Sequence, residues 1–163
     1  MVTISELGLA ICRWVRGLCP DEDVEQPSPL QDYKMSWQEL KALFGSTFPG
    51  AQLYIWDSWY YYVSHEDWGV VLEDVLLGMP KYTTSRFDCE NFATLCTCRV
   101  SSKYLINSMG IAVGKHNGQP HGFNVFLSRV DEEPQLYLLE PQTGMVHPPS
   151  EPEGYEVDYA IVG

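Results

Sequence analysis

The chain has 163 residues, of which 45% are hydrophobic and 20% are charged. A chain of this length suits one domain, and its composition excludes an intrinsically disordered protein because it can bury a sizeable core. Lys and Arg number 10 against 22 for Asp and Glu, which gives a net charge of −12. This charge repels phosphate groups, so we expect neither nucleic acid nor an anionic membrane surface as a partner.

The cysteines are odd in number and do not form a dense disulfide framework. Cys96 and Cys98 stand too close together for half of a usual zinc site, so free thiols in a reducing compartment are the simplest account. We find no apolar run long enough to cross a membrane. Glu6, Arg13 and Arg16 also fall in the wrong order for a secretion signal. We therefore expect a cytoplasmic protein without a membrane span.

The N-terminal part of the chain is predicted to hold a helix and then a loop. Apolar residues at helical spacing favour a helix over residues 3–18. Residues 20–29 are rich in acids and proline, which is typical of a surface loop. We assign residues 1–35 to this helix and loop and residues 36–163 to a core, all within a single domain spanning 1–163.

Helices and an aromatic strand region follow. Ser36 and Glu39 match a capping box and predict a helix over residues 36–45. Residues 52–63 are rich in aromatic side chains and predict one or two strands around Asp57. A further helix is expected from Ser64 to about Gly78, where glycine favours a helix end.

The longest helical pattern covers residues 89–109, with Asp88 at its start and Gly110 as the closing glycine. Short strands are then predicted over residues 111–114, 121–130, 135–141 and 155–162, separated by turn signals. Helices followed by paired strands predict an α+β fold, in which the central helix packs on an antiparallel sheet.

Cys89 stands in the first turn of that long helix. A helix N-terminus carries partial positive charge and unpaired N–H groups, both of which stabilise a thiolate. We therefore regard Cys89 as a candidate nucleophile. The alternative is a buried cysteine that acts as a small apolar side chain, and this is the better interpretation for Cys96 and Cys98.

His121 and Glu140 are the candidate base and orienting acid. His121 opens one predicted strand and Glu140 closes the next, so pairing of these strands can bring them to one face. A turn centred on residues 131–134 would instead pair Glu140 with Val125, so an earlier turn or bulges would be required. Asn124 and Gln142 are further candidates for orienting the histidine or binding substrate.

Three blocks of sequence resemble one superfamily. DCENFA at 88–93 is similar to the helix start of transglutaminase-like and papain-like cysteine peptidases of phages and bacteria. HGFNVF at 121–126 is similar to their histidine strand, and LEPQTG at 139–144 to their acid-bearing strand end. The protease domain of a fungal agglutinin is similar as well. The resemblance implies a papain/transglutaminase-like fold and a thiol hydrolase that cleaves an amide or peptide bond through Cys89, His121 and Glu140.

The same resemblance raises the question of calcium, because some relatives are calcium-activated. By that pattern Glu90, Asn91, Glu140 and Gln142 are possible oxygen ligands. Asn91 stands where the family usually has an acid, which weakens this expectation. We expect no required cofactor.

The sequence is also compatible with functions other than a peptidase. The first alternative is a non-catalytic interaction protein that keeps the fold, with the aromatic segment Tyr54–Tyr62 as a binding face. The second alternative is a cell-wall amidase or endopeptidase. Asp57 is either part of a capped turn or part of a substrate cleft. His65 is expected at a helix start, and His116 and His147 are expected in solvated turns.

Overall fold

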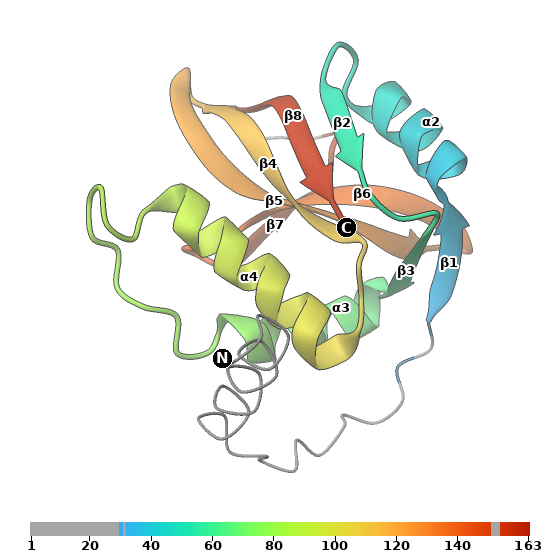
Figure 1. Ribbon diagram of the computed structural model, residues 1–163, viewed down its shortest axis with the longest axis horizontal. Coiled ribbons are helices and arrows are strands. Elements are labelled where there is room, and N and C mark those ends of the chain that lie inside the picture. The colour runs from blue at the N-terminus through green and yellow to red at the C-terminus, as the bar shows by residue number, and fades with distance from the viewer. Residues whose placement is uncertain (1–29, 31, 151–153) are drawn as a thin grey trace, which may run out of the picture.

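A computed structural model describes Leu30, residues 32–150 and residues 154–163 of the chain. The predicted helix over residues 3–18, the loop over residues 20–29 and two of the cysteines, Cys12 and Cys19, lie outside these residues. Within the described part, the fold is α+β, with three helices and a curled, mixed sheet (Figure 1).

The first helices begin where the sequence predicts. After strand β1 (Tyr33–Ser36), helix α2 spans Trp37–Thr47 and starts at the capping box of Ser36 and Glu39. Strands β2 (Gln52–Ile55) and β3 (Trp59–Ser64) form on either side of Asp57, as predicted. Helix α3 spans His65–Leu76, and the Ser64 hydroxyl accepts a hydrogen bond from the backbone N–H of Asp67 at 3.0 Å.

The long central helix is shorter than predicted. Helix α4 spans Cys89–Tyr104 and ends with Leu105 in the left-handed conformation, at φ 57°. Gly110 is not its closing residue but lies in strand β4 (Met109–His116). A Cβ atom on Gly110 would lie 2.2 Å from the carbonyl oxygen of Ile161, so glycine is required there by the close approach of a neighbouring strand.

The remaining strands are β5 (Gln119–Val130), β6 (Glu133–Glu140), β7 (Met145–His147) and β8 (Tyr155–Val162). The strand order is β1-β3-β5-β4-β8-β2, and β6 pairs with both β5 and β7. The expected antiparallel sheet is in fact mixed, because β2 runs parallel to β8 and β3 runs parallel to β5. Strands β1 and β7 are too short to leave a pattern in the sequence.

The turn between β5 and β6 sets the register of the strands that carry the candidate site. It consists of Asp131 and Glu132 alone, both with positive φ, and Val130 pairs with Glu133. A two-residue turn of this kind matches the twist of a hairpin. Pro134 therefore lies inside β6 rather than in the turn, and Val125 faces Leu138 instead of Glu140.

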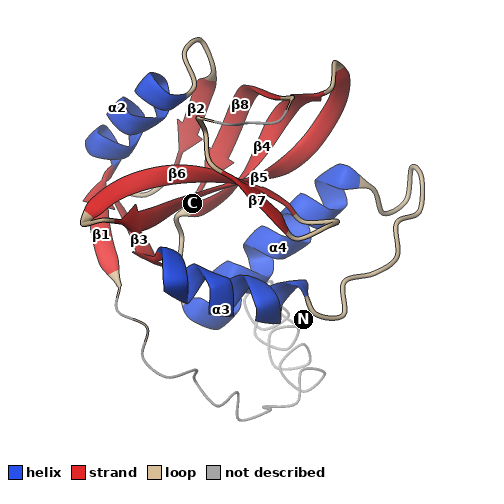
Figure 2. Ribbon diagram, turned by 180° about the vertical axis from the view of Figure 1, so that it is seen from behind, coloured by secondary structure: helices blue, strands red, loops and turns tan. Residues whose placement is uncertain are grey.

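Helices cover both faces of the sheet. Helix α2 packs on one face, where Leu40 and Phe44 join Phe123, Val125 and Leu127 in one cluster of the core. Helices α3 and α4 pack on the other face, where Trp68 and Val100 join Phe126. Figure 2 shows α2 on one side of the strands and α3 with α4 on the other. Successive residues of β5 therefore point to opposite layers of the core.

None of the helices in the described part is long and apolar enough to span a membrane.

Candidate functional site

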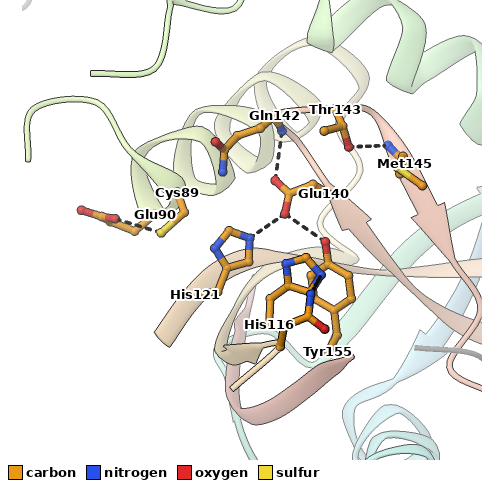
Figure 3. Close-up of polar contacts among 10 residues, drawn as sticks. Cys89, Glu90, His116, His121, Glu140, Gln142, Thr143, Met145 and Tyr155 are labelled. Carbon is orange, nitrogen blue, oxygen red and sulfur yellow. Dashed lines mark hydrogen bonds and ion pairs between the residues drawn. The ribbon is translucent and has the colours of Figure 1, made fainter. Parts of the chain in front are cut away.

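The site lies where the ends of β5 and β6 meet the start of α4 (Figure 3). Asp88 is the N-cap residue of α4, and its backbone N–H donates to Asn91 Oδ1 at 3.2 Å. Asn91 thus serves the capping role that an acid would serve at this position. Cys89 follows as the first residue of the helix, as the sequence predicts.

The surroundings of Cys89 disfavour a thiolate. Burial raises the pKa of the thiol; a backbone hydrogen bond at Gly122 opposes the rise, and the hydrogen bond and negative charge of Glu90 add to it. Cys89 Sγ lies 3.5 Å from Glu90 Oε2. Protonated thiol is the form that such a contact stabilises, because the carboxylate accepts the S–H and repels an ionised sulfur.

His121 and Glu140 do come together. His121 Nε2 lies 2.5 Å from Glu140 Oε2, and the two side chains are only 16% and 8% exposed. The pairing of β5 with β6 ends with Asn124 facing Leu139, so Glu140 reaches His121 diagonally across the two strands rather than directly opposite. The predicted pairing of these two residues is therefore correct, although the register that produces it differs from the one expected.

Glu140 is held by further donors. The Tyr155 hydroxyl donates to Glu140 Oε2 at 3.1 Å, and the backbone N–H of Gln142 donates to Oε1 at 3.2 Å. An ionised carboxylate has about four lone-pair positions, so these bonds leave acceptor capacity for a ligand. The carboxylate is thus both fixed in place and able to bind another donor.

A pocket of about 370 Å³ opens beside this carboxylate. His116 stacks on Tyr155 with ring centroids 4.2 Å apart, and His147 approaches the same ring at 5.1 Å. The remaining residues of the lining are His121, Glu140, Gln142, Thr143 and Met145. The volume lies in the usual range for small-molecule sites, and the lining combines aromatic rings with polar groups.

Cys89 is not among the residues that line this pocket. His121 belongs to the face of β5 that carries Phe123, whereas the Asn124 amide points the other way and donates to the Ala93 carbonyl of α4 at 2.9 Å. Strand β5 and helix α4 come into close contact at Gly122, where an added Cβ atom would lie 3.2 Å from the backbone of Glu90. This close approach brings Cys89 to the edge of the sheet beside His121 (Figure 3).

The candidate orienting residues have different positions. Asn124 is fully buried, and its amide nitrogen also donates to Thr97 Oγ1 and to the Gly110 carbonyl, so it ties α4 to β4. Gln142 is exposed and lines the pocket.

The residues named as possible calcium ligands point in different directions. Glu90 points toward Cys89 and away from Glu140 (Figure 3), and Asn91 Oδ1 already accepts the backbone N–H of Asp88. Among the described residues, no group of three or more His, Cys, Asp or Glu side chains is arranged to hold a metal ion. Calcium stays a prediction from the resemblance, and no role is assigned to it.

The other candidates are distributed as follows. Asp57 lies in the loop between β2 and β3, where its Oδ2 accepts a hydrogen bond from the Asn107 amide at 2.9 Å. The aromatic segment is divided by strand alternation, since Tyr60 and Tyr62 are buried while Trp56, at 80% exposure, and Trp59 are not. His65 is the first residue of α3, as expected.

Two histidines were assigned wrongly, and other pocket residues were missed. His116 and His147 were expected in solvated turns, but they lie in β4 and β7 and line the pocket. Tyr155, Thr143 and Met145 also gave no local signal. Their approach depends on the pairing of β4 with β8 and of β6 with β7.

Comparisons with known proteins bear on the fold. No family model matches the sequence, and no curated protein matches it. Among solved structures, the chain is similar to a PSL1a–E64 complex, with 18% sequence identity and a TM-score of 0.64, over 78% of this chain and 51% of the other. It is equally similar, at 18% identity and TM-score 0.64, to Polyporus squamosus lectin bound to the human-type influenza-binding epitope Neu5Aca2-6Galb1-4GlcNAc. The chain spans about half the length of these proteins.

These findings correct the prediction of family and activity. The similar structures are those of a lectin, so the assignment to the transglutaminase-like and papain-like cysteine peptidases of phages and bacteria is wrong. The prediction of a thiol hydrolase acting on a protein or peptide substrate is therefore also wrong, and so is the alternative of a cell-wall enzyme. A papain-like architecture is not shown. What the likeness shows is the fold: this chain folds like about half of a Polyporus squamosus lectin chain.

Proposed function

We propose that the chain is a carbohydrate-binding protein and that the pocket beside Glu140 is its sugar site. The observation that carries the proposal is the Glu140 carboxylate, which is buried and fixed by His121, Tyr155 and the backbone of Gln142. A fixed acceptor of this kind suits a sugar hydroxyl, since a site built to hydrogen-bond a hydroxyl strongly disfavours ligands without one.

The rest of the lining supports the same ligand. Gln142 and Thr143 are exposed at the rim and offer amide and hydroxyl groups. Tyr155 and His116 form a stacked aromatic pair, and aromatic rings supply apolar contact area with a polar edge. A sugar ring has both hydroxyl groups and apolar C–H faces, so it can use both kinds of contact.

The likeness to a lectin bound to a glycan is a second line of support. It favours the non-catalytic interaction protein that keeps the fold, which was the first alternative drawn from the sequence. The ligand of that lectin is a property of that protein, and this chain spans about half of it. The pocket beside Glu140, and not the likeness, is what supports the location of the site.

A binding measurement with single substitutions tests the proposal. We expect saturation-transfer NMR with a panel of mono- and disaccharides to detect a ligand. Gln142→Ala should lower the affinity for that ligand about fivefold, because one hydrogen bond contributes about 1 kcal/mol. Gln38→Ala removes the same amide from the exposed surface of α2 and should leave affinity unchanged. Absence of binding across the whole panel would overturn the proposal.

A catalytic triad of Cys89, His121 and Glu140 stays a prediction about the site. The compound E64, named in the PSL1a complex, tests this prediction. Because the pKa of Cys89 is raised, we expect incubation with E64 to leave the intact mass of the chain unchanged. A mass increase that Cys89→Ser abolishes would show a nucleophilic thiol and contradict a purely binding role for this site.

A further inference from the structure

The charges around the sugar pocket bear on which glycan it accepts, an inference that rests on the proposed function. The pocket is lined by His116, His121, Glu140, Gln142, Thr143, Met145, His147 and Tyr155. Neither lysine nor arginine is among these residues. Among the described residues, the titratable groups that line the space are thus the Glu140 carboxylate, three imidazoles and the phenol of Tyr155.

The neighbouring cation does not reverse the charge of Glu140. Lys115 precedes His116 in β4, and alternation directs it to the opposite face of the sheet. Its Nζ lies 3.1 Å from Glu156 Oε2, so its charge is largely balanced. The whole chain carries −12, and its field also disfavours the approach of an anion.

The Glu140 carboxylate is placed where a ligand would meet it. It is 7% exposed, and the low dielectric of such a position strengthens its repulsion of another anion. Glu140 also accepts three hydrogen bonds, from His121, Tyr155 and the Gln142 backbone, which keep it fixed rather than free to turn away. An acidic sugar would therefore place its own carboxylate against a second one, with neither lysine nor arginine among the described lining residues to bridge them.

We propose that the pocket selects uncharged glycans and rejects sugars that bear a carboxylate, including terminal sialic acid. This specificity differs from that of the similar lectin, which was solved with the sialylated Neu5Aca2-6Galb1-4GlcNAc. The shared fold does not fix it, because the charge of the lining depends on the side chains of this chain alone.

The experiment compares pairs of ligands in which one member is neutral and the other carries a carboxylate. One pair is Galb1-4GlcNAc and the sialylated trisaccharide that contains it. The other pair is glucose and glucuronic acid. Affinities are measured by calorimetry or NMR at about pH 8, above the range in which imidazoles usually protonate. For a pair whose neutral member binds, we expect the acidic member to bind roughly tenfold more weakly, with the ratio shrinking as salt is added.

A charge variant ties the effect to the pocket. Gln142→Lys places an ammonium group at the exposed rim and should bring the affinity ratio of each binding pair close to one. Gln142→Met has similar length without charge and should keep the preference for the neutral member. Melting curves of both variants confirm folding before binding is compared.

The outcomes separate the two proposals. If an acidic sugar binds as tightly as its neutral partner or more tightly, the charge selectivity is wrong while the sugar site stands. If the Gln142→Met and Gln142→Lys variants change the ratio of neutral to acidic affinity equally, the charge of Glu140 is not the cause of the preference. If neither neutral nor acidic sugars bind at all, the proposed function fails and the selectivity fails with it.

Discussion

At the scale of single residues, the chemistry of a side chain depends on neighbours that the local sequence does not display. Cys89 stands at a helix N-terminus, which by itself favours a thiolate. Burial and the carboxylate of Glu90 act in the opposite direction and raise the pKa. His121 and Glu140 illustrate the reverse case, because both were found from strand ends and the structure does bring them together.

The raised pKa of Cys89 predicts how the alkylation rate of the thiol depends on pH. Alkylation of Cys89 by iodoacetamide, followed by peptide mass spectrometry, should show an inflection above the value of about 8.5 that is usual for a free thiol. Glu90→Gln should move the inflection to lower pH, because a negative charge is removed, and Glu66→Gln on the exposed start of α3 should not. An inflection below about pH 7 would contradict the structure and indicate an activated cysteine.

At the scale of elements, helix α4 secures the end of α3. Arg99 Nη1 donates to the carbonyls of Val75 and Leu77 at 2.6 and 3.0 Å, which satisfies groups that a helix C-terminus leaves open. Lys103 Nζ lies 2.7 Å from Asp74 Oδ1, and the Tyr104 hydroxyl donates to the same carboxylate at 2.9 Å. These contacts hold together the two helices that cover one face of the sheet.

The contact between the two helices predicts a loss of stability in acid. The hydrogen bond from Lys103 lowers the pKa of Asp74 from its usual value of 3.8, although burial opposes this. Because the pKa of Asp74 is lower in the folded chain than in the unfolded chain, the ionised carboxylate stabilises the fold at any pH above its pKa in the unfolded chain. This contribution disappears as the pH falls through the pKa of Asp74 in the folded chain. In urea unfolding, Asp74→Asn should therefore be less stable than wild type near neutral pH, and the difference should vanish in strong acid.

Lys103→Met is the partner variant for this measurement. It removes the main donor to Asp74, so the pH dependence of unfolding should become shallower in the acid range. Both side chains are about a third exposed, at 36% and 35%, so the effect is expected to be small and weaker at high salt. A difference between wild type and Asp74→Asn that persists unchanged in strong acid would exclude this mechanism.

At the scale of the whole molecule, the sheet decides which residues form the site. The pocket collects side chains from β4, β5, β6, β7, β8 and the turn after β6. It exists because β4 pairs with both β5 and β8 along most of its length. Close packing of these strands depends on Gly110 and Gly114, whose added Cβ atoms would lie 2.2 and 1.9 Å from backbone carbonyl oxygens.

Strand packing at Gly110 makes a prediction for the global fold. Gly110→Ala should destabilise the chain by about 3 kcal/mol or more, because the Ile161 carbonyl that it meets belongs to backbone and cannot turn aside. Gly45→Ala is the matched control, since nothing lies within 4 Å of its added Cβ in helix α2, and it should be neutral or stabilising. Equal melting temperatures of Gly110→Ala and wild type would show that β4 and β8 are paired less closely than the structure describes.

Much of the element content could be predicted from the sequence, because its signals are local. Ser36 and Ser64 mark helix starts by capping, and aromatic runs mark β2 and β3. The end of α4 could not be predicted, because Leu105 adopts the left-handed conformation without a glycine to indicate it. The parallel pairs β2–β8 and β3–β5 join segments far apart in the chain, and no local pattern reports such contacts.

The sequence by itself determined an acidic α+β chain and the start of α4 at Cys89, since these follow from charge and capping. It named His121 and Glu140 as strand-end residues that strand pairing could bring together, and the register of β5 and β6 decided that they meet. The tertiary structure decided what surrounds those residues. It placed Tyr155 and His116 beside Glu140, and Glu90 beside Cys89. Motifs record residue types along one segment, whereas burial, charge and pocket shape arise from strands and helices that meet only in the folded chain.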